Sequence, residues 1–384
     1  MKHSLAIIHT QFGPYHFARA KALMSEFSGS IQLIQLASHE AQRQWNVTAT
    51  DFPKVLTVAS GVLETLDPQA IAKKLVDSLN QISPSVLVIA GYLYPAMRAA
   101  ADWAKQRNIP TILLSDSQHL DRPRNFIKEQ IKAIWLRRHY DAAFVAGASA
   151  AFYLSSLGFP LHKIWRGYDV VDNHYFNEQA QTIQSSREYS RNLLSLPEKY
   201  FLFVGRFSPE KNLLRLLEAY HLYHQRIKTT TWSLVMVGDG PQENDLKLKA
   251  NQLGLTDIIW TGFMQVDELP TYYSLASALI LPSLSEPWGL VVNEAMVCRL
   301  PILISERCGC IPDLVFPGIN GFVFDPYDVN GMSESLTEIS LKSNEVLQSM
   351  GQKSHQIIAN YTPKNWAKAL TNCIEKVIES KNKI

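Results

Sequence analysis

The stretch ALILPSLSEPWGLVVNEAM occupies residues 278–296 and joins several local patterns in a row. Ala278–Pro282 is a short apolar run, which predicts a buried strand. Ser283–Trp288 is rich in turn-forming residues and predicts the loop at the carboxyl end of that strand. From Gly289 the pattern turns helical. A strand that is apolar on both faces and leads directly into a helix is typical of a parallel sheet covered on both sides.

The same alternation of short apolar runs and helical segments continues along the chain. In the first half, strands are expected at Leu5–Thr10, Ile31–Leu36, Val55–Val58, Val86–Tyr92, Thr111–Asp116, Ala142–Ala146 and Ile164–Val171. In the second half, they are expected at Phe201–Arg206, Ser233–Val237, Ile258–Phe263, Ala278–Pro282, Ile302–Ser305 and Gly321–Phe324. This pattern predicts the α/β class, with two doubly wound parallel sheets.

A chain of 384 residues exceeds what one hydrophobic core normally holds. The polar stretch 173–198 loses strand character, which favours a domain boundary there. The final helical pattern has no strand after it, so it is free to return to the first domain. We therefore expect residues 1–180, joined by the C-terminal helix 365–384, to face residues 181–364 across a cleft, with ligands at the carboxyl ends of the strands.

The composition is that of an ordinary globular protein, with 46% hydrophobic and 19% charged residues. No apolar run is long enough to span a bilayer. The four cysteines fit neither a zinc site nor a disulfide framework, which favours the reducing cytoplasm. The sequence also lacks the basic and aromatic pattern of a nucleic-acid reader.

Charged residues gather in the loops that follow strands. Arg206 and Lys211 flank the turn in Gly205–Asn212, where a guanidinium and an ammonium suit a pyrophosphate. The alternative is that both are solvated loop cations. The next loop contains Gly238 and Gly240, which allow a tight turn after a strand. A functional site and a plain structural turn are equally expected there.

The loop and helix quoted first suit an anionic ligand. The amides of Gly289, Leu290 and Val291 lie at a helix N-terminus, where anions bind favourably. Glu286 precedes this helix, and Glu294 lies about one turn inside it. The two acids are thus offset along a bound ligand, which suits a sugar at Glu286 and a ribose at Glu294. In the alternative, Glu294 only favours the helix dipole and Glu286 only caps a turn.

Motifs in the second half resemble a known family when they are taken in order. GRFSPEKN, VGDGP, WTGF, LPSLSEPWGLVVNEAM and CIPDLVFPGINGFVFDPYD are similar to successive signatures of the retaining glycosyltransferases of GT-B fold, family 4, the glycosyl transferases group 1. The match covers nearly all of 200–330, and GYDVVDN at 167–173 resembles the first domain of the same family. The resemblance implies a nucleotide sugar as co-substrate, with no cofactor and no metal.

The resemblance also implies roles for single positions. Arg206 and Lys211 match the pair that grips the donor diphosphate, Glu294 the acid that binds the ribose, and Glu286 the acid beside the transferred sugar. The remaining donor-side matches are Leu290 and Val291 at phosphate or sugar oxygens, Gly262 and Phe263 at the base, and Gly13 near the donor phosphate. The chain departs from the usual pattern at Pro287-Trp288 and Gly309-Cys310.

Acceptor-side candidates come from the first half. His16 and Arg19 begin the helix after the first strand, and the alternative is that both are plain surface residues. Asp116 ends a strand, and His119 follows it into the cleft. In the resembled family a histidine near here touches the transferred sugar, so His119 is assigned to the catalytic set with Asp121 as its rival. A hydrogen-bonded structural histidine is the alternative.

Residues 122–139 form a basic, amphipathic pattern. Ile127, Ile131, Ile134 and Trp135 fall at helical spacing, and the surrounding cations are Arg122, Arg124, Lys128, Lys132, Arg137 and Arg138. Such a helix can rest on anionic lipid, which would give a cytoplasmic protein a membrane contact. In the alternative, the apolar stripe packs on the helix's own sheet and the basic face is solvated.

Taken together with the residue patterns, the resemblance implies a retaining glycosyltransferase. It would move a sugar from a nucleoside-diphosphate sugar, with a UDP-sugar as the first candidate, to a hydroxyl on a glycolipid, polysaccharide precursor or small molecule. Glu286 and His119 are the expected catalytic residues. The alternatives are a nucleotide-sugar epimerase of the same fold and a non-catalytic nucleotide-sugar-binding subunit. A dehydrogenase is disfavoured because no Gly-x-Gly-x-x-Gly follows the first strand.

Overall fold

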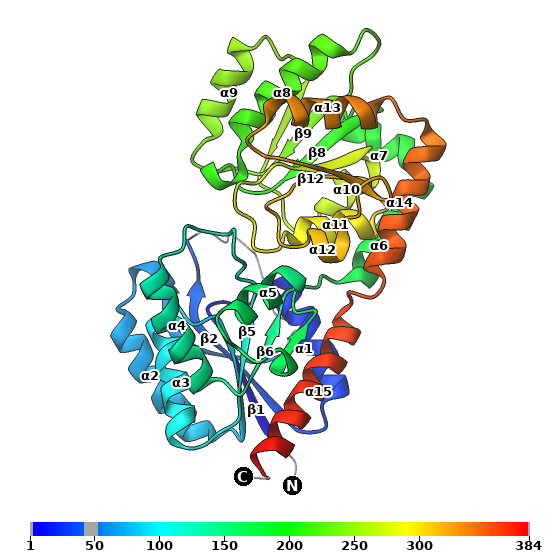
Figure 1. Ribbon diagram of the computed structural model, residues 1–384. Helices are drawn as coiled ribbons and strands as arrows, with labels where there is room; N and C mark the ends of the chain where they lie inside the picture. Colours follow the sequence, from blue (N-terminus) through cyan, green and yellow to red (C-terminus); the bar gives the residue numbers. More distant parts are fainter. Residues whose placement is uncertain (1–2, 42–52, 383–384) are drawn as a thin grey trace. The chain divides into compact units, whose positions relative to one another are not determined.

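The structure is a computed structural model that describes residues 3–41 and 53–382 (Figure 1). It divides into two compact units. The first unit comprises 1–119, 123–172 and 361–384, and the second comprises 120–122 and 173–360. The sequence predicted that the chain leaves the first unit after residue 180 and returns to it at residue 365. In the structure it leaves after residue 172 and returns at residue 361.

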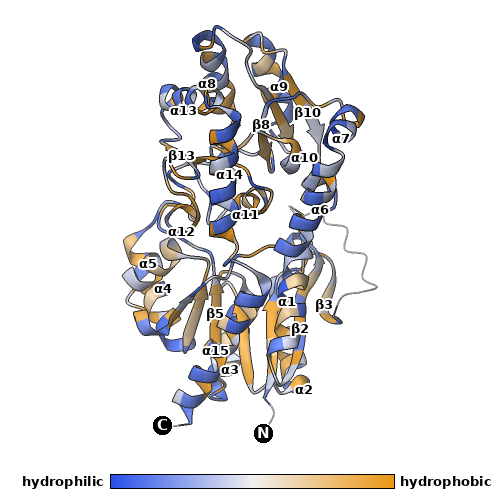
Figure 2. Ribbon diagram, turned by 90° about the vertical axis from the view of Figure 1, so that its right-hand side faces the viewer, coloured by the Kyte–Doolittle hydropathy of each residue, from blue (hydrophilic) through white to orange (hydrophobic). Residues whose placement is uncertain are grey.

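The first unit is built on a fully parallel sheet in the order β3-β2-β1-β4-β5-β6-β7. Its strands are β1 (Ser4–His9), β2 (Ser30–His39), β3 (Val55–Val62), β4 (Val86–Ala90), β5 (Thr111–Ser115), β6 (Ala142–Val145) and β7 (Ile164–Arg166). The central strands are almost entirely buried, which is why they read as continuous apolar runs. Figure 2 shows them as hydrophobic segments in the interior of the unit.

Helices cover this sheet. They are α1 (Pro14–Glu26), α2 (Pro68–Ile82), α3 (Pro95–Gln106), α4 (Phe126–His139), α5 (Ala148–Ser156) and α15 (Pro363–Lys381), with short 3₁₀ turns at Leu63–Thr65 and Leu161–Lys163. The C-terminal helix α15 packs beside α1 (Figure 1). Its buried residues Trp366, Leu370 and Ile374 belong to the same core as Leu5 and Ile7 of β1. The final helix therefore completes the first unit.

The second unit repeats the architecture with a parallel sheet in the order β10-β9-β8-β11-β12-β13. Its strands are β8 (Tyr200–Val204), β9 (Ser233–Val237), β10 (Ile258–Gly262), β11 (Ala278–Leu281), β12 (Ile302–Ser305) and β13 (Gly321–Phe324). Its helices are α6 (Asn173–Ser185), α7 (Arg187–Leu193), α8 (Leu213–Arg226), α9 (Glu243–Gln252), α10 (Leu269–Leu275), α11 (Leu290–Val297), α12 (Ile311–Leu314), α13 (Val329–Ser340) and α14 (Asn344–Ile358), with a 3₁₀ turn at Pro209–Lys211.

Both sheets have one topological switch point. The strand order reverses between β1 and β4 in the first unit and between β8 and β11 in the second. Loops at the carboxyl ends of such neighbouring strands diverge, and the crevice between them is where ligands of doubly wound folds bind. The predicted α/β class with two parallel sheets is confirmed.

Several sequence expectations were wrong in detail. The strand expected at Ile164–Val171 ends at Arg166, because Gly167 turns the chain with φ 101°. The apolar stripe of α4 does not pack on its sheet, since Ile127 and Ile131 are exposed.

Among the described helices, none is both long and apolar enough to cross a membrane.

Candidate functional site

The loops after β8 and β11 in the second unit are tied to each other at its switch point. Asn212 takes a left-handed conformation with φ 61°, and its Nδ2 donates to the carbonyl oxygens of Pro282, at 3.1 Å, and Pro326, at 2.8 Å. The amide of Leu284 also donates to the carbonyl oxygen of Glu210 at 2.8 Å. These bonds fix the loop that carries Lys211 against the loop that carries Glu286.

Lys211 and Glu286 form an ion pair across these loops. The ammonium Nζ donates to Glu286 Oε2, which also accepts from Ser283 Oγ at 3.3 Å. The two side chains are only 19% and 12% exposed. Burial by itself lowers the pKa of the Lys211 ammonium, but the charge and hydrogen bond of Glu286 outweigh it and the pKa is raised. Lys211 therefore stays a cation at neutral pH.

The loop after β12 holds Glu286 from a second side. The amide of Gly309 donates to the carbonyl oxygen of Glu286 at 3.0 Å. Cys308 and Cys310 flank this contact and are buried. Burial, with the nearby Glu286 charge, raises the pKa of both thiols well above the usual range. They stay protonated and fill space beside the carboxylate rather than acting as nucleophiles.

The start of α11 presents unbonded amides next to this ion pair in the chain. Gly289 has φ 100°, and a Cβ at this position would lie 3.3 Å from Glu286 Cγ and 3.2 Å from Leu281 Cδ2. Across the part of the chain that the structure describes, the amides of Leu290 and Val291 donate to no protein acceptor. As first-turn amides of a helix they suit an anion.

Glu294 lies one turn further along α11 and is only 3% exposed. Its Oε2 accepts from the hydroxyl of Tyr273 in α10 at 2.7 Å. Tyr273 was missed from the sequence, because nothing local connects a tyrosine to a carboxylate in a later helix. It fixes the orientation of the carboxylate that the sequence assigned to a ribose.

Arg206 follows the end of β8 and is exposed. Its guanidinium makes no hydrogen bond or ion pair within residues 3–41 and 53–382, so it is available to an anion. The turn after β9 packs directly on this loop. A Cβ on Gly238 would lie 2.0 Å from the carbonyl oxygen of Gly205, and one on Gly240 would lie 2.5 Å from that of Phe207. Both glycines are therefore required by close packing.

Gly262 and Phe263 lie at the carboxyl end of the edge strand β10. Gly262 has φ 78°, and its carbonyl oxygen accepts from the amide of Gly238 at 2.8 Å. Phe263 is 38% exposed. The two residues thus adjoin the same glycine-containing turn that supports the Arg206 loop.

In the first unit, Gly13, His16 and Arg19 have structural partners. The amide of Gly13 donates to His16 Nδ1 at 2.9 Å, which caps the start of α1. Arg19 is only 3% exposed. Its Nη1 donates to the carbonyl oxygen of Tyr168 at 2.9 Å and lies 3.7 Å from Asp169 Oδ1. Arg19 is therefore not a surface residue, and it anchors the GYDVVDN segment to α1.

Asp116 and His119 follow β5 and are both exposed. The ring of His119 lies 6.4 Å from that of Tyr153 in α5. Asp121, the rival candidate, groups with the second unit. There its carbonyl oxygen accepts from Ser285 Oγ, and Arg307 Nη2 donates to the carbonyl oxygen of Leu120 at 2.9 Å. Among the described residues, no cluster of His, Cys, Asp and Glu is placed to hold a metal ion.

Comparisons with known proteins place part of the chain in a family of transferases. Residues 185–357 match the family model for glycosyl transferases group 1. The chain is 28% identical over 313 residues to a sulfoquinovosyl transferase of Arabidopsis thaliana, covering 78% of this chain and 56% of the relative. The chain spans about half the length of the curated relatives it matches.

Solved structures share the architecture over the whole chain. Sucrose-phosphate synthase from Thermosynechococcus elongatus superposes with a TM-score of 0.77 and 16% identity, covering 99% of this chain and 100% of the other. HepE of Anabaena, in complex with UDP and glucose, gives a TM-score of 0.72 and 14% identity with full coverage of both chains. The chain therefore has the expected GT-B fold, and its residues 185–357 match the glycosyl transferases group 1 family.

Proposed function

We propose that the protein is a glycosyltransferase that moves a sugar from a nucleoside-diphosphate sugar to a hydroxyl acceptor with retention at the anomeric carbon. One observation carries this proposal. The switch point of the second unit combines a protonated lysine, first-turn amides of α11 that bond to no acceptor among the described residues, and two buried glutamates, Glu286 in a loop and Glu294 in α11. A diphosphate flanked by two sugars needs cationic and amide donors in the middle and carboxylate acceptors on either side.

In this reading, Arg206, Lys211 and the amides of Leu290 and Val291 bind the donor diphosphate. Glu294, held by Tyr273, accepts from ribose hydroxyls. The base lies against Gly262 and Phe263. Glu286 already holds the Lys211 ammonium in its charged form. The ammonium can therefore stabilise the negative charge that develops on the departing diphosphate. Stabilisation of that charge is the main catalytic contribution.

The chemical step breaks the bond between the anomeric carbon and the diphosphate oxygen and forms one to the acceptor oxygen on the same face. The proton of the acceptor hydroxyl passes to the departing phosphate oxygen. Glu286 supports the positive charge that develops on the sugar ring. No metal ion or cofactor is part of this proposal. From the first unit, we propose that His119 contacts the transferred sugar and that Asp116 and His16 line the acceptor side, near the approach of Gly13 to the phosphate.

UDP is the first nucleotide to test, since the Anabaena structure of the same fold contains it. The experiment incubates the protein with a panel of nucleotide sugars and follows release of nucleoside diphosphate, with and without sugar, glycolipid and polysaccharide-type acceptors. Two results together support the proposal. Nucleoside diphosphate is released only when an acceptor is present, and the glycoside product has the same anomeric configuration as the donor sugar. Isomerised sugar nucleotide would identify an epimerase, and binding without turnover would identify a non-catalytic subunit.

A further inference from the structure

Helix α4 turns its apolar stripe outward. Ile127, Ile131 and Ile134 are 68%, 63% and 43% exposed. They stand at i, i+4 and i+7, so they share one face of the helix. The buried residues of α4 are Ala133 and Leu136 alone. An isoleucine on a surface is common, but three in one row on a helix that buries so little are not explained by packing of the unit itself.

The inward side of α4 is held by polar contacts to α5 and α3 rather than by the isoleucines. Glu129 accepts from Lys132 Nζ at 2.6 Å and from the hydroxyl of Tyr153 in α5 at 2.5 Å. Near the end of the helix, His139 Nε2 lies 2.8 Å from Asp102 Oδ1 in α3. The helix is thus anchored through polar contacts, and the apolar stripe is left for something outside the unit.

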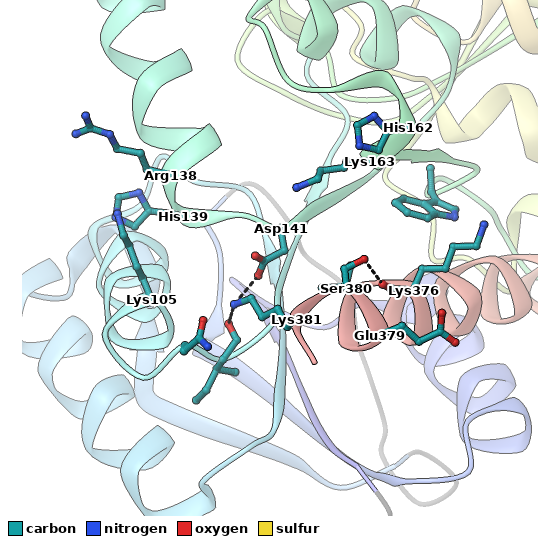
Figure 3. A pocket seen from close by; sticks show the side chains of 14 residues that line it. Lys105, Arg138, His139, Asp141, His162, Lys163, Lys376, Glu379, Ser380 and Lys381 are labelled. Carbon is teal, nitrogen blue, oxygen red and sulfur yellow. Dashed lines mark hydrogen bonds and ion pairs between the residues drawn. The ribbon is translucent and has the colours of Figure 1, made fainter. Parts of the chain in front are cut away.

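The exposed side of α4 is also cationic. Lys128, Arg137 and Arg138 are exposed, whereas the one acid of the helix, Glu129, is turned inward and paired. Arg138 continues the row of isoleucines, four residues after Ile134. It also borders an open cavity of about 830 Å³ that carries further cations around its rim (Figure 3).

The cavity extends the basic surface beyond the helix. Its cationic lining residues are Lys105, Arg138, Lys163, Lys376 and Lys381. Lys381 is paired with Asp141 at 3.0 Å (Figure 3). The lining contains one other acid, Glu379, so cations remain in excess.

We propose that this face of α4 docks on an anionic lipid bilayer. The isoleucines enter the boundary between headgroups and acyl chains, and Lys128, Arg137 and Arg138 meet lipid phosphates. An apolar row bordered by cations matches the layered chemistry of such a surface. A second copy of the chain is disfavoured as the occupant, because it would bring the same cations against one another. The proposal does not depend on the transferase activity.

Flotation of the purified protein with vesicles tests the docking directly. One set is pure phosphatidylcholine, and the other contains one third phosphatidylglycerol. We expect binding to the anionic set only, and weaker binding as salt is raised, because salt screens the cations. Absence of binding to anionic vesicles at low salt would overturn the proposal.

Matched variants separate the stripe from general charge effects. Ile127→Glu with Ile131→Glu should lower the vesicle partition coefficient at least about tenfold, since burial of two large apolar side chains is lost. The control is Leu248→Glu with Leu341→Glu, which changes the charge equally at leucines of the second unit that are 59% and 66% exposed. An equal loss in both pairs would show that net charge alone drives binding and would overturn the role of α4.

Charge reversal gives an independent readout. Lys128→Glu with Arg138→Glu should also lower partition by about tenfold or more, since each cation near an anionic surface contributes roughly fivefold. Lys228→Glu with Lys353→Glu is the matched control on the second unit. If the protein instead forms a dimer in light scattering that Ile127→Glu with Ile131→Glu disrupts, the face is an interface between copies and the lipid proposal fails. Unchanged unfolding midpoints show that the variants remain folded.

Discussion

At the residue scale, the Lys211–Glu286 pair allows stability and catalysis to be separated. Lys211→Met leaves the Glu286 carboxylate buried without its cation, which should lower the free energy of unfolding by about 3 kcal/mol. Adding Glu286→Gln removes the stranded charge, so the double variant should recover most of that loss. Both variants should release nucleoside diphosphate at least about 100-fold more slowly, because the cation that we propose faces the leaving group is gone.

Urea unfolding and a product-release assay measure the two quantities on the same samples. Recovery of stability without recovery of turnover is the expected pattern. If Lys211→Met keeps both the unfolding free energy and the turnover of the unchanged protein, Lys211 neither balances Glu286 nor binds the diphosphate. The pair was not foreseen from the sequence because its members are 75 residues apart.

His355 gives a pH-dependent prediction at the same scale. Its Nδ1 lies 3.0 Å from the carbonyl oxygen of Val297 at the end of α11, and Arg299 Nη2 lies 3.4 Å from its Nε2. Burial, with the Arg299 charge, lowers the pKa of His355 below its ordinary 6.5. The unfolded chain then binds this proton more readily, so stability should fall as pH drops below about 6.5.

The His355→Asn variant keeps a donor for the Val297 carbonyl but cannot titrate. Urea unfolding at pH 7.5 and pH 5.5 should show a smaller acid loss of stability in this variant than in the unchanged protein. Contributions from the rest of the chain are common to both proteins and cancel in the difference. Identical losses would show that His355 does not take up a proton in this range.

At the element scale, the start of α11 depends on one glycine. Gly289→Ala places a Cβ at φ 100° and against Glu286, so nucleoside diphosphate affinity should fall by about tenfold or more, measured by calorimetry. Gly254→Ala is the control, because Gly254 has φ 69° with no atom within 4 Å of the added Cβ. Each substitution should cost about 1–2 kcal/mol of stability through backbone strain. Only the first should weaken nucleotide binding, and an equal effect of both would remove the helix start from the site.

The elements also show what the sequence could predict. Each strand expected from an apolar run is present. The central strands leave the clearest signal in their own residues, because they are buried on both faces. The orientation of α4 could not be predicted, because spacing identifies a stripe but not the partner that it faces. Here polar contacts on the opposite side, from Glu129 to Tyr153 of α5 and from His139 to Asp102 of α3, hold the helix. Tyr273 was missed for a related reason, since its contact with Glu294 arises only when α10 and α11 pack together.

At the scale of the whole molecule, the two units should respond separately to perturbation. Trp366→Ala removes a buried side chain of α15 from the core of the first unit, which should cost that unit about 3–5 kcal/mol. A nucleoside diphosphate should instead stabilise the second unit, by mass action on the proposed donor site. Calorimetric unfolding with and without UDP checks both effects. Lys368→Ala, an exposed change on the same helix, should shift neither unit, and a shift of the UDP-sensitive transition by Trp366→Ala would contradict the assignment of α15.

The placement of α15 has a consequence for synthesis on the ribosome. The second unit is encoded between two parts of the first, so its sheet can close while the first still lacks Trp366, Leu370 and Ile374. In a nascent chain that has emerged only to residue 360, the core of the first unit is therefore still exposed where α15 will pack. Exposed apolar surface of this kind is what chaperones bind. The first unit, whose synthesis begins first, is thus the last to be completed.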